Sequence, residues 1–109
     1  MALSRRTKAY PAPKGVSKEE WMRLTPFTQR VYLAALRIPK GETRSYHWVA
    51  KESGKPKAMR AVGNALHRNP FAPTIPCHRV VKADGSLGGY AHGISRKRAL
   101  LRQEGWVGW

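Results

Sequence analysis

Cys77 is the only cysteine of the 109-residue chain, and it stands between Pro76 and His78. A single cysteine can form no internal disulfide, and there is no cysteine cluster to hold a metal ion. Two interpretations remain: a buried, inert thiol or a reactive thiolate. The neighbours favour the thiolate, because His78 could accept the thiol proton and the positive charge of Arg79 would stabilise the anion. Pro76 would also fix the backbone just before the nucleophile.

A histidine base needs a group that holds its ring, and a carboxylate is the usual choice. The chain offers six acidic residues: Glu19, Glu20, Glu42, Glu52, Asp84 and Glu104. Asp84 is better explained by a turn with Gly85. Glu104 closes a helix, where a carboxylate opposes the helix dipole, and a residue that breaks a local rule suggests a function. The alternative for His78 is an ordinary buried structural histidine.

The segment from Asn69 to Val81, which contains Pro-Cys-His-Arg-Val, resembles the active-site motif of the O6-alkylguanine-DNA alkyltransferases. The resemblance runs from about Thr25 to about Gly105 and includes Arg-Ala-Val-Gly at 60–63 and Glu-Gly at 104–105. It implies a relay of Cys77, His78 and Glu104, with the histidine acting directly or through a water. The activated thiolate would take the alkyl group from O6-alkylguanine irreversibly, in one turnover and without a cofactor or metal.

The same resemblance implies how the damaged base reaches the cysteine. The base must leave the duplex, so Arg60 would fill the gap while Tyr46 promotes rotation of the nucleotide and donates to the departing guanine. The other implied site residues are Asn69, which braces the active-site loop, Lys97 near the leaving guanine, Tyr90 as a pocket wall, and the backbone at Val80 and Ala91. Structural alternatives stay open, since Tyr46 could be a packed aromatic, Asn69 a helix terminator and Lys97 a solvated side chain.

Four positions depart from the family's pattern. Ala91 stands where many members carry a serine that can hydrogen-bond to the O6 atom, and Ala72 replaces a proline of the pocket wall seen in some members. Met59 is bulkier than the usual small residue, and His92 occupies a position often held by glycine. A wider pocket beside Ala72 could admit alkyl groups larger than methyl.

Charge points to the partner independently of any motif. Lysine and arginine number 21 against 6 acidic residues, a formal net charge of +15. Such an excess favours binding to nucleic acid. The alternatives are a solubilising surface or a small RNA-binding protein, because charge does not separate DNA from RNA. The resemblance implies double-stranded DNA carrying O6-alkylguanine, bound by a monomer.

The alternative is an alkyltransferase-like protein, which resembles this fold but binds the lesion and flags it without transferring the alkyl group. Such proteins usually have tryptophan in place of the cysteine. Cys77 argues against that alternative. A general nucleic-acid-binding module is the third hypothesis, and it would have no use for Cys77, His78 and Glu104. The chain has no apolar run of ~20 residues and no signal-like N-terminus, which predicts an intracellular protein, in cytoplasm and nucleoid or in a nucleus, without membrane contact.

Capping residues locate the elements that must position these groups. Ser17 and Thr25-Pro26 each predict a helix start, and the second helix should end at Pro39. Ser45 predicts a helix to about Ser53, and Pro56 one to about Arg68, so that the pair forms a helix-turn-helix. The second helix of the pair would approach DNA through its small and basic residues Ala58, Arg60, Ala61, Gly63 and Arg68.

The remaining elements are predicted to be short. Residues 75–81 should be a strand or extended run, and Ser95 should cap a last helix that ends at Glu104 and Gly105, with 106–109 packing back. The predicted fold is a mainly α, single small domain with a winged-helix-like helix-turn-helix and a short β-hairpin or extended active-site segment. Residues 1–16 are predicted to be a basic, flexible arm, and residues 17–109 the alkyltransferase DNA-binding and active-site domain.

Overall fold

The computed structural model describes residues 10–90 and 92–106. Its helices are α2 (Lys18–Met22), α3 (Pro26–Leu36), α4 (Tyr46–Glu52), α5 (Met59–His67) and α6 (Ile94–Gln103), with a 3₁₀ turn η1 (Cys77–Arg79). Two short strands, β1 (Arg44–Ser45) and β2 (Val80–Val81), form one parallel pair. The mainly α class with a helix-turn-helix is therefore confirmed. No helix in the described ranges has the length and apolarity that crossing a membrane would need.

Side-chain caps fix three helix starts where the sequence predicted them. The hydroxyl of Ser17 accepts the Glu20 N–H, that of Thr25 accepts the Thr28 N–H, and that of Ser45 accepts the Trp48 N–H. Each bond satisfies a backbone donor that has no partner inside its own helix. The start of α4 is therefore anchored at Ser45, directly before Tyr46.

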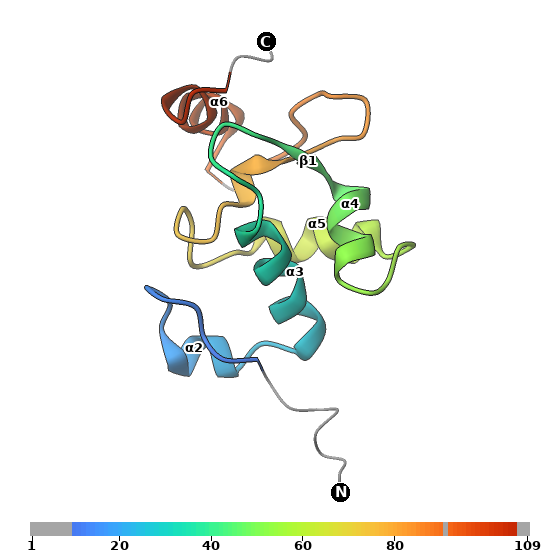
Figure 1. Cartoon of the computed structure of the whole chain (residues 1–109), viewed down its shortest axis with the longest axis vertical. Coiled ribbons are helices and arrows are strands. Elements are labelled where there is room, and N and C mark those ends of the chain that lie inside the picture. The colour runs from blue at the N-terminus through green and yellow to red at the C-terminus, as the bar shows by residue number, and fades with distance from the viewer. Residues whose placement is uncertain (1–9, 91, 107–109) are drawn as a thin grey trace, which may run out of the picture.

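Helices α3, α4 and α5 pack against one another. Helix α2 lies near the start of α3 in the lower part of the view, and α6 lies in the upper part (Figure 1). An aromatic cluster of Trp21, Tyr32 and Phe71 lies in the core, with ring centroids between 6.1 and 6.4 Å apart. The Tyr32 hydroxyl donates to the Ala65 carbonyl at 2.6 Å, which ties α3 to α5. The core and this hydrogen bond thus fix the position of α5 relative to α3.

Helix α5 begins at Met59, three residues later than predicted from Pro56. The Ala58 N–H donates to the Lys55 carbonyl at 2.9 Å, which closes a β-turn with Pro56 at its second position. Proline suits that turn position as well as a first helical position, because both need the same φ. The turn between α4 and α5 is consequently longer than expected, and Ala58 is the N-cap of α5.

The segment around Cys77 is coiled rather than extended. The Cys77 N–H donates to the Ile75 carbonyl at 2.8 Å across Pro76, whose φ of −82° and ψ of 68° are those of an inverse γ-turn. A 3₁₀ turn follows over Cys77–Arg79, and only Val80–Val81 is a strand. The prediction of a strand or extended run over 75–81 is therefore wrong for its first five residues.

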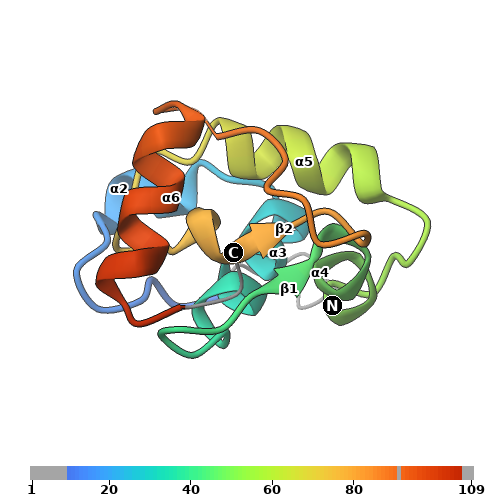
Figure 2. The same ribbon diagram turned by 90° about the horizontal axis from the view of Figure 1, so that it is seen from above.

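The sheet is a parallel pair, with Arg44 opposite Val80 and Ser45 opposite Val81, and not a hairpin. Figure 2 shows β1 and β2 side by side at the centre of the molecule. The chain does turn back after β2, through the predicted turn at Asp84 and Gly85, where Lys82 N–H donates to the Ser86 carbonyl. No described residue beyond that turn pairs with β2 as a strand, and the amine of Lys97 donates to the Val80 and Gly89 carbonyls.

The ends of α6 differ from the prediction at the start and agree at the finish. Its N-cap is Gly93, with φ of +93°, and Ser95 lies inside the first turn. Gly93 can adopt this φ without strain and its N–H donates to the Tyr90 carbonyl, which makes the sharp turn into α6. At the other end Gly105 N–H and Trp106 N–H donate to the Arg102 and Leu101 carbonyls, the pattern of a Schellman motif.

The predicted arm of residues 1–16 lies only partly within the described residues. From residue 10 on, the chain lies against the body of the domain. The Tyr10 N–H donates to Gln29 Oε1 at 3.0 Å, the Trp21 indole donates to the Tyr10 carbonyl at 2.6 Å, and Val16 is buried. Tyr10 and Val16 thus contact the body of the domain, while the arm and its boundary at residue 16 stay predictions. Of the C-terminal residues expected to pack back, 107–109 lie outside the described residues.

Candidate active site

We call the loop of residues 70–76, which leads to Cys77, the active-site loop. The buried side chain of Asn69 holds it at both ends. Asn69 follows α5, and its Nδ2 donates to the Ile75 carbonyl at 2.8 Å while its Oδ1 accepts the Phe71 N–H at 2.9 Å. Because Ile75 stands two residues before Cys77, these bonds fix the approach of the chain to the cysteine. Cys77 itself is buried, with 5% of its surface exposed.

Three side chains form a tight cluster behind Cys77. His78 Nε2 lies 3.0 Å from Glu104 Oε2, and Arg79 Nη2 donates to the same oxygen at 2.8 Å. Arg79 Nε donates to Glu104 Oε1 at 2.9 Å, so the guanidinium binds both carboxylate oxygens. The remaining Nη1 of Arg79 donates to the Ile38 carbonyl at 2.7 Å, which fastens the cluster to the end of α3. The C-terminal end of α6 thereby reaches the residue next to the cysteine.

Glu104 is held ionised and so determines which nitrogen of His78 carries a proton. Burial favours the neutral acid, but the hydrogen bonds from Arg79 and His78 outweigh it, so the pKa of Glu104 is lowered. An ionised carboxylate can only accept hydrogen bonds, so Nε2 of a neutral His78 must be the protonated nitrogen. The other nitrogen, Nδ1, is buried and has no partner among the described residues. Its lone pair is therefore available to take a proton.

The electrostatics keep the histidine neutral and the cysteine protonated at rest. Burial lowers the pKa of His78 below its usual range, more than the neighbouring Glu104 raises it. Burial also raises the pKa of Cys77, although Asn69, Lys97 and Tyr90 each act in the opposite direction. A buried thiol beside a neutral imidazole is a pair that can pass one proton, and the thiolate exists only when the base accepts it.

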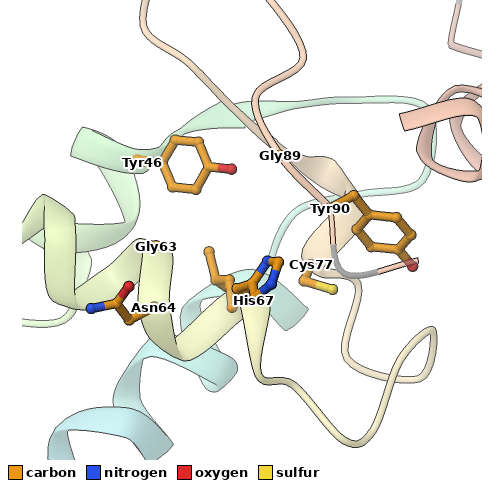
Figure 3. A pocket seen from close by; sticks show the side chains of 8 residues that line it. Tyr46, Gly63, Asn64, His67, Cys77, Gly89 and Tyr90 are labelled. Carbon is orange, nitrogen blue, oxygen red and sulfur yellow. The ribbon is translucent and has the colours of Figure 1, made fainter. Parts of the chain in front are cut away.

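A pocket of about 260 Å³ opens onto Cys77. Figure 3 shows the side chains that line it, with the Cys77 sulfur pointing toward Tyr90. The lining residues come from α4, α5, the active-site loop and the loop before α6, and they are Tyr46, Gly63, Asn64, Leu66, His67, Cys77, Gly89 and Tyr90. We call this cavity the Cys77 pocket. Its walls combine aromatic faces with a few polar groups, as small-molecule sites do.

Tyr46 lines the Cys77 pocket and lies against Gly88. Gly88 has φ of +72°, and a Cβ at this position would lie 3.0 Å from the Tyr46 hydroxyl and 3.2 Å from its ring. Such contacts are tighter than most Cβ atoms make, so a side chain at this position would be strained by the positive φ and would push Tyr46 away by a few tenths of an ångström. Burial raises the pKa of Tyr46, and the nearby Cys77 raises it further, so the hydroxyl remains a donor at neutral pH.

Lys97 is fully buried, and its amine faces backbone carbonyls. It donates to the carbonyl of Val80 at 2.7 Å, to that of Gly89 at 3.2 Å, and to that of Leu87. The amine also lies 5.9 Å from the centre of the Tyr46 ring. Burial lowers the pKa of Lys97 to about 8. Lys97 thus ties β2 and the loop after it to α6, and it does not line the Cys77 pocket.

A second, larger hollow of about 730 Å³ adjoins the Cys77 pocket and shares Tyr46, Gly63 and Gly89 with it. Arg60 and Met59 line this hollow from the start of α5. We call it the Arg60 groove. The shared lining residues place the exposed Arg60 in a hollow next to the one that opens onto Cys77.

The other predicted DNA-binding residues are spread along α5. Ala61 and Arg68 are exposed, Ala58 and Gly63 are half-buried, and a Cβ on Gly63 would meet nothing within 4 Å. Arg68 lines neither the Cys77 pocket nor the Arg60 groove. The arrangement leaves one face of α5 open to a partner.

Two predicted substrate contacts are not placed in the Cys77 pocket. The Val80 side chain is buried, and its carbonyl accepts from Lys97, so Val80 belongs to the support of the site. Ala91 lies outside the described residues. In the part of the chain that the structure describes, no three histidine, cysteine or acidic side chains converge as metal ligands would.

Sequence reasoning missed several residues that the fold brings to the site. Arg79 was expected to act only through its charge, yet it clamps Glu104. Asn64, Leu66 and His67 line the Cys77 pocket from one face of α5. Leu66 and His67 stand three and four positions after Gly63, and this spacing was the available signal, because residues three and four apart share a helix face.

The comparisons with known proteins agree with one another. The family described as "6-O-methylguanine DNA methyltransferase, DNA binding domain" matches residues 26–106. A Mycobacterium tuberculosis protein named methylated-DNA–protein-cysteine methyltransferase is 57% identical over 83 residues, which cover 76% of this chain and 50% of that protein. The chain thus spans about half the length of the mycobacterial relatives it matches.

Two solved structures bear on the fold and its setting. Mycobacterium tuberculosis OGT in complex with DNA superposes with a TM-score of 0.72 at 57% identity, over 75% of this chain and 51% of that one. Schizosaccharomyces pombe Atl1, in complex with damaged DNA containing O6-carboxymethylguanine, gives a TM-score of 0.66 at 30% identity, over 72% and 75% of the two chains.

Proposed function

The chain belongs to the 6-O-methylguanine DNA methyltransferase family, and from that premise we propose that it repairs DNA by moving the alkyl group of O6-alkylguanine onto its own Cys77. The observation that carries the proposal is Cys77 at the Cys77 pocket with the His78–Glu104 pair behind it. The reaction is a single turnover, because a thioether is not reversed. Double-stranded DNA with one alkylated guanine is the substrate, and a monomer binds it.

The chemistry follows from the positions of three groups. Nδ1 of His78 takes the thiol proton, through a bridging water or after a small rotation, while Nε2–H stays bonded to Glu104. The Cys77 thiolate then attacks the alkyl carbon, forming a carbon–sulfur bond and breaking the bond between that carbon and O6. Tyr46 lines the pocket, and its hydroxyl would be the donor that stabilises the departing guanine anion.

Delivery of the base uses the Arg60 groove. The base must leave the stack to reach a buried sulfur. Arg60 is exposed and lines the groove, which adjoins the Cys77 pocket, and its side chain would enter the duplex where the base has left. The two helices of the helix-turn-helix would lie along the DNA, and the exposed basic residues around them would contact phosphates without reading sequence.

The test is intact-protein mass spectrometry after mixing the chain with a duplex that carries one O6-methylguanine. The expected result is a gain of one methylene's mass, mapped to Cys77 and absent from Cys77→Ser and from reactions with undamaged duplex. No gain, together with tight and selective binding of the damaged duplex, would instead support a lesion-flagging protein of the Atl1 kind. No gain and no preference for the lesion would leave only a basic nucleic-acid binder.

A further inference from the structure

A third cavity shares Tyr90 with the Cys77 pocket. It has a volume of about 260 Å³ and is lined by Ala72, Pro73, Tyr90, His92, Arg96 and Leu100. We call it the Arg96 pocket. Tyr90 lines both cavities, so a single aromatic side chain separates them.

The reacting sulfur is directed toward this dividing side chain. In Figure 3 the Cys77 sulfur points toward Tyr90, and the Tyr90 hydroxyl lies close enough to Cys77 to lower its pKa. Displacement at carbon requires the sulfur, the carbon and the leaving O6 atom to lie in line. Whatever else the reacting carbon carries must then project sideways from that line. A tail of two or more heavy atoms therefore needs space beside that line, and the Arg96 pocket, which shares Tyr90 with the Cys77 pocket, offers such space.

Arg96 gives the Arg96 pocket a positive charge, and Ala72 contributes only a small side chain to its wall. Arg96 is exposed and forms an ion pair with no described carboxylate, although the charge of Arg96 is felt at the Tyr90 hydroxyl. His92 packs edge-on against Tyr90 at 5.4 Å and adds ring nitrogens that can bond to an acceptor. Ala72 contributes only a methyl group to the lining, which leaves room beside Tyr90.

We propose that the Arg96 pocket binds the anionic tail of an O6-alkyl group, so that this chain preferentially repairs guanines carrying a carboxylate-ended alkyl group such as carboxymethyl. The inference rests on the proposed function and adds a substrate class to it. The guanidinium of Arg96 bonds to the carboxylate, while His92 and Tyr90 border it. A neutral tail of the same shape gains no such bond.

The reaction balances as it does for methyl. The thiol proton passes to His78, the sulfur bonds to the methylene carbon, and the bond from that carbon to O6 breaks. Guanine leaves as an anion and takes one proton from water at its ring nitrogen, and His78 returns the thiol proton to water, while the carboxymethyl group stays on Cys77 with its carboxylate intact. No oxidant, reductant or second substrate takes part.

The experiment compares two duplexes that differ only in tail charge, one with O6-carboxymethylguanine and one with O6-carbamoylmethylguanine, the neutral amide of the same shape. Single-turnover rate constants for transfer to Cys77 are measured at subsaturating DNA. We expect the carboxymethyl duplex to react about fivefold faster, a modest factor because the guanidinium is exposed to solvent. Equal rates, or faster reaction of the amide, would overturn the inference.

Variants of α6 assign the preference to one side chain. Arg96→Gln should bring the ratio of the two rates close to one, whereas Arg96→Lys should keep part of the preference because the positive charge remains. Arg98→Gln removes the same charge two residues away, outside the Arg96 pocket, and should leave the ratio as in the parent chain. Because each comparison is a ratio, a change in general DNA affinity cancels. An unchanged ratio in Arg96→Gln, or an equal loss in Arg98→Gln, would refute the assignment.

The outcome also separates this inference from the function on which it rests. Failure of the proposed function means that no alkyl group, methyl included, appears on Cys77. Failure of the inference alone means that methyl is transferred to Cys77 while tail charge makes no difference to the rate.

Discussion

Arg79 and Glu104 are held to each other by two hydrogen bonds, and this pairing sets the geometry of the base. A carboxylate that is fixed at both oxygens presents one lone pair to His78 Nε2 in a single direction. The guanidinium does not reach the substrate, so Arg79 is a positioning residue. Its importance follows from rigidity, because a base that can swing away from the thiol accepts its proton less often.

Two replacements of Arg79 separate geometry from charge. Arg79→Lys keeps the positive charge but loses the two-pronged contact, so we expect the transfer rate to fall about tenfold with little change in its pH dependence. Arg79→Gln removes the charge, which at present lowers the pKa of His78, so the acid limb of the pH profile should move to higher pH. Arg37→Lys is the control, since Arg37 pairs with Glu52 at an exposed site. A rate for Arg79→Lys equal to that of this control would contradict a positioning role.

The direction of the His78 shift predicts the pH dependence of the reaction. Burial lowers the pKa of His78, so the ring stays neutral, and able to accept a proton, at pH values below the ~6.5 of a free imidazole. The transfer rate should therefore be nearly constant between about pH 8 and ~6.5, the pKa of free imidazole, and should fall only at lower pH. Single-turnover rates at saturating damaged duplex measure this, and a midpoint above that of free imidazole would exclude a neutral, buried base.

At the scale of elements, the loop between β2 and α6 is shaped by a glycine that meets an aromatic ring. Gly88 and Gly85 both have positive φ, but only Gly88 has Tyr46 within 4 Å of its missing Cβ. Gly85→Ala should cost about 1 kcal/mol of unfolding free energy from backbone strain alone. Gly88→Ala should add displacement of Tyr46 to that cost, and slow transfer about tenfold. Thermal unfolding and transfer rates measure both, and equal rates in the two variants would mean that Tyr46 does not need this contact.

Lys97 holds the same loop from the other side. Replacing it by methionine would leave the carbonyls of Val80, Leu87 and Gly89 without their buried donor. We expect Lys97→Met to lower the free energy of unfolding by about 2–4 kcal/mol. Arg98→Met, an exposed neighbour on α6, should change it by less than about 0.5 kcal/mol. Chemical denaturation of both variants is the measurement, and a loss in Lys97→Met no larger than in the control would contradict the role as a tie.

Capping residues in the sequence predicted most of the helix starts. Where the prediction was wrong, contacts between distant parts of the chain determined the structure. Ser17, Thr25 and Ser45 cap their helices because the bond that each one makes spans only three residues. Pro56 misled because turns and helix starts both accept proline, and the choice depends on how α5 packs.

The active-site residues show the same difference between local sequence signals and long-range contacts. The resemblance pointed to Cys77, His78 and Glu104, and the fold brings the last two within 3.0 Å although 26 positions separate them. The role of Lys97 could not be predicted from sequence, because its partners are backbone carbonyls and carry no sequence signal. The clamp from Arg79 was likewise hidden, since which of six acidic residues it meets depends on where α6 ends.

At the scale of the whole molecule, the net charge of +15 separates binding from chemistry. Neutralising phosphates releases counterions, so affinity for the damaged duplex should fall steeply with salt, with a slope of log K on log salt between about −3 and −6. The proposed transfer at Cys77 would take place at a buried sulfur and would begin from a neutral thiol and a neutral imidazole. Salt should therefore leave the rate at saturating duplex almost unchanged.

The free base O6-methylguanine supplies the matched control for that prediction, because it carries no phosphate. Its slow reaction with Cys77 should be insensitive to salt, whereas the reaction of subsaturating duplex should lose as much rate as binding loses affinity. Arg60→Ala should slow the duplex reaction and spare that of the free base, since only the duplex needs its base turned out. If salt slowed both reactions equally, charge would act on the cysteine itself, and binding and chemistry would not be separable in this molecule.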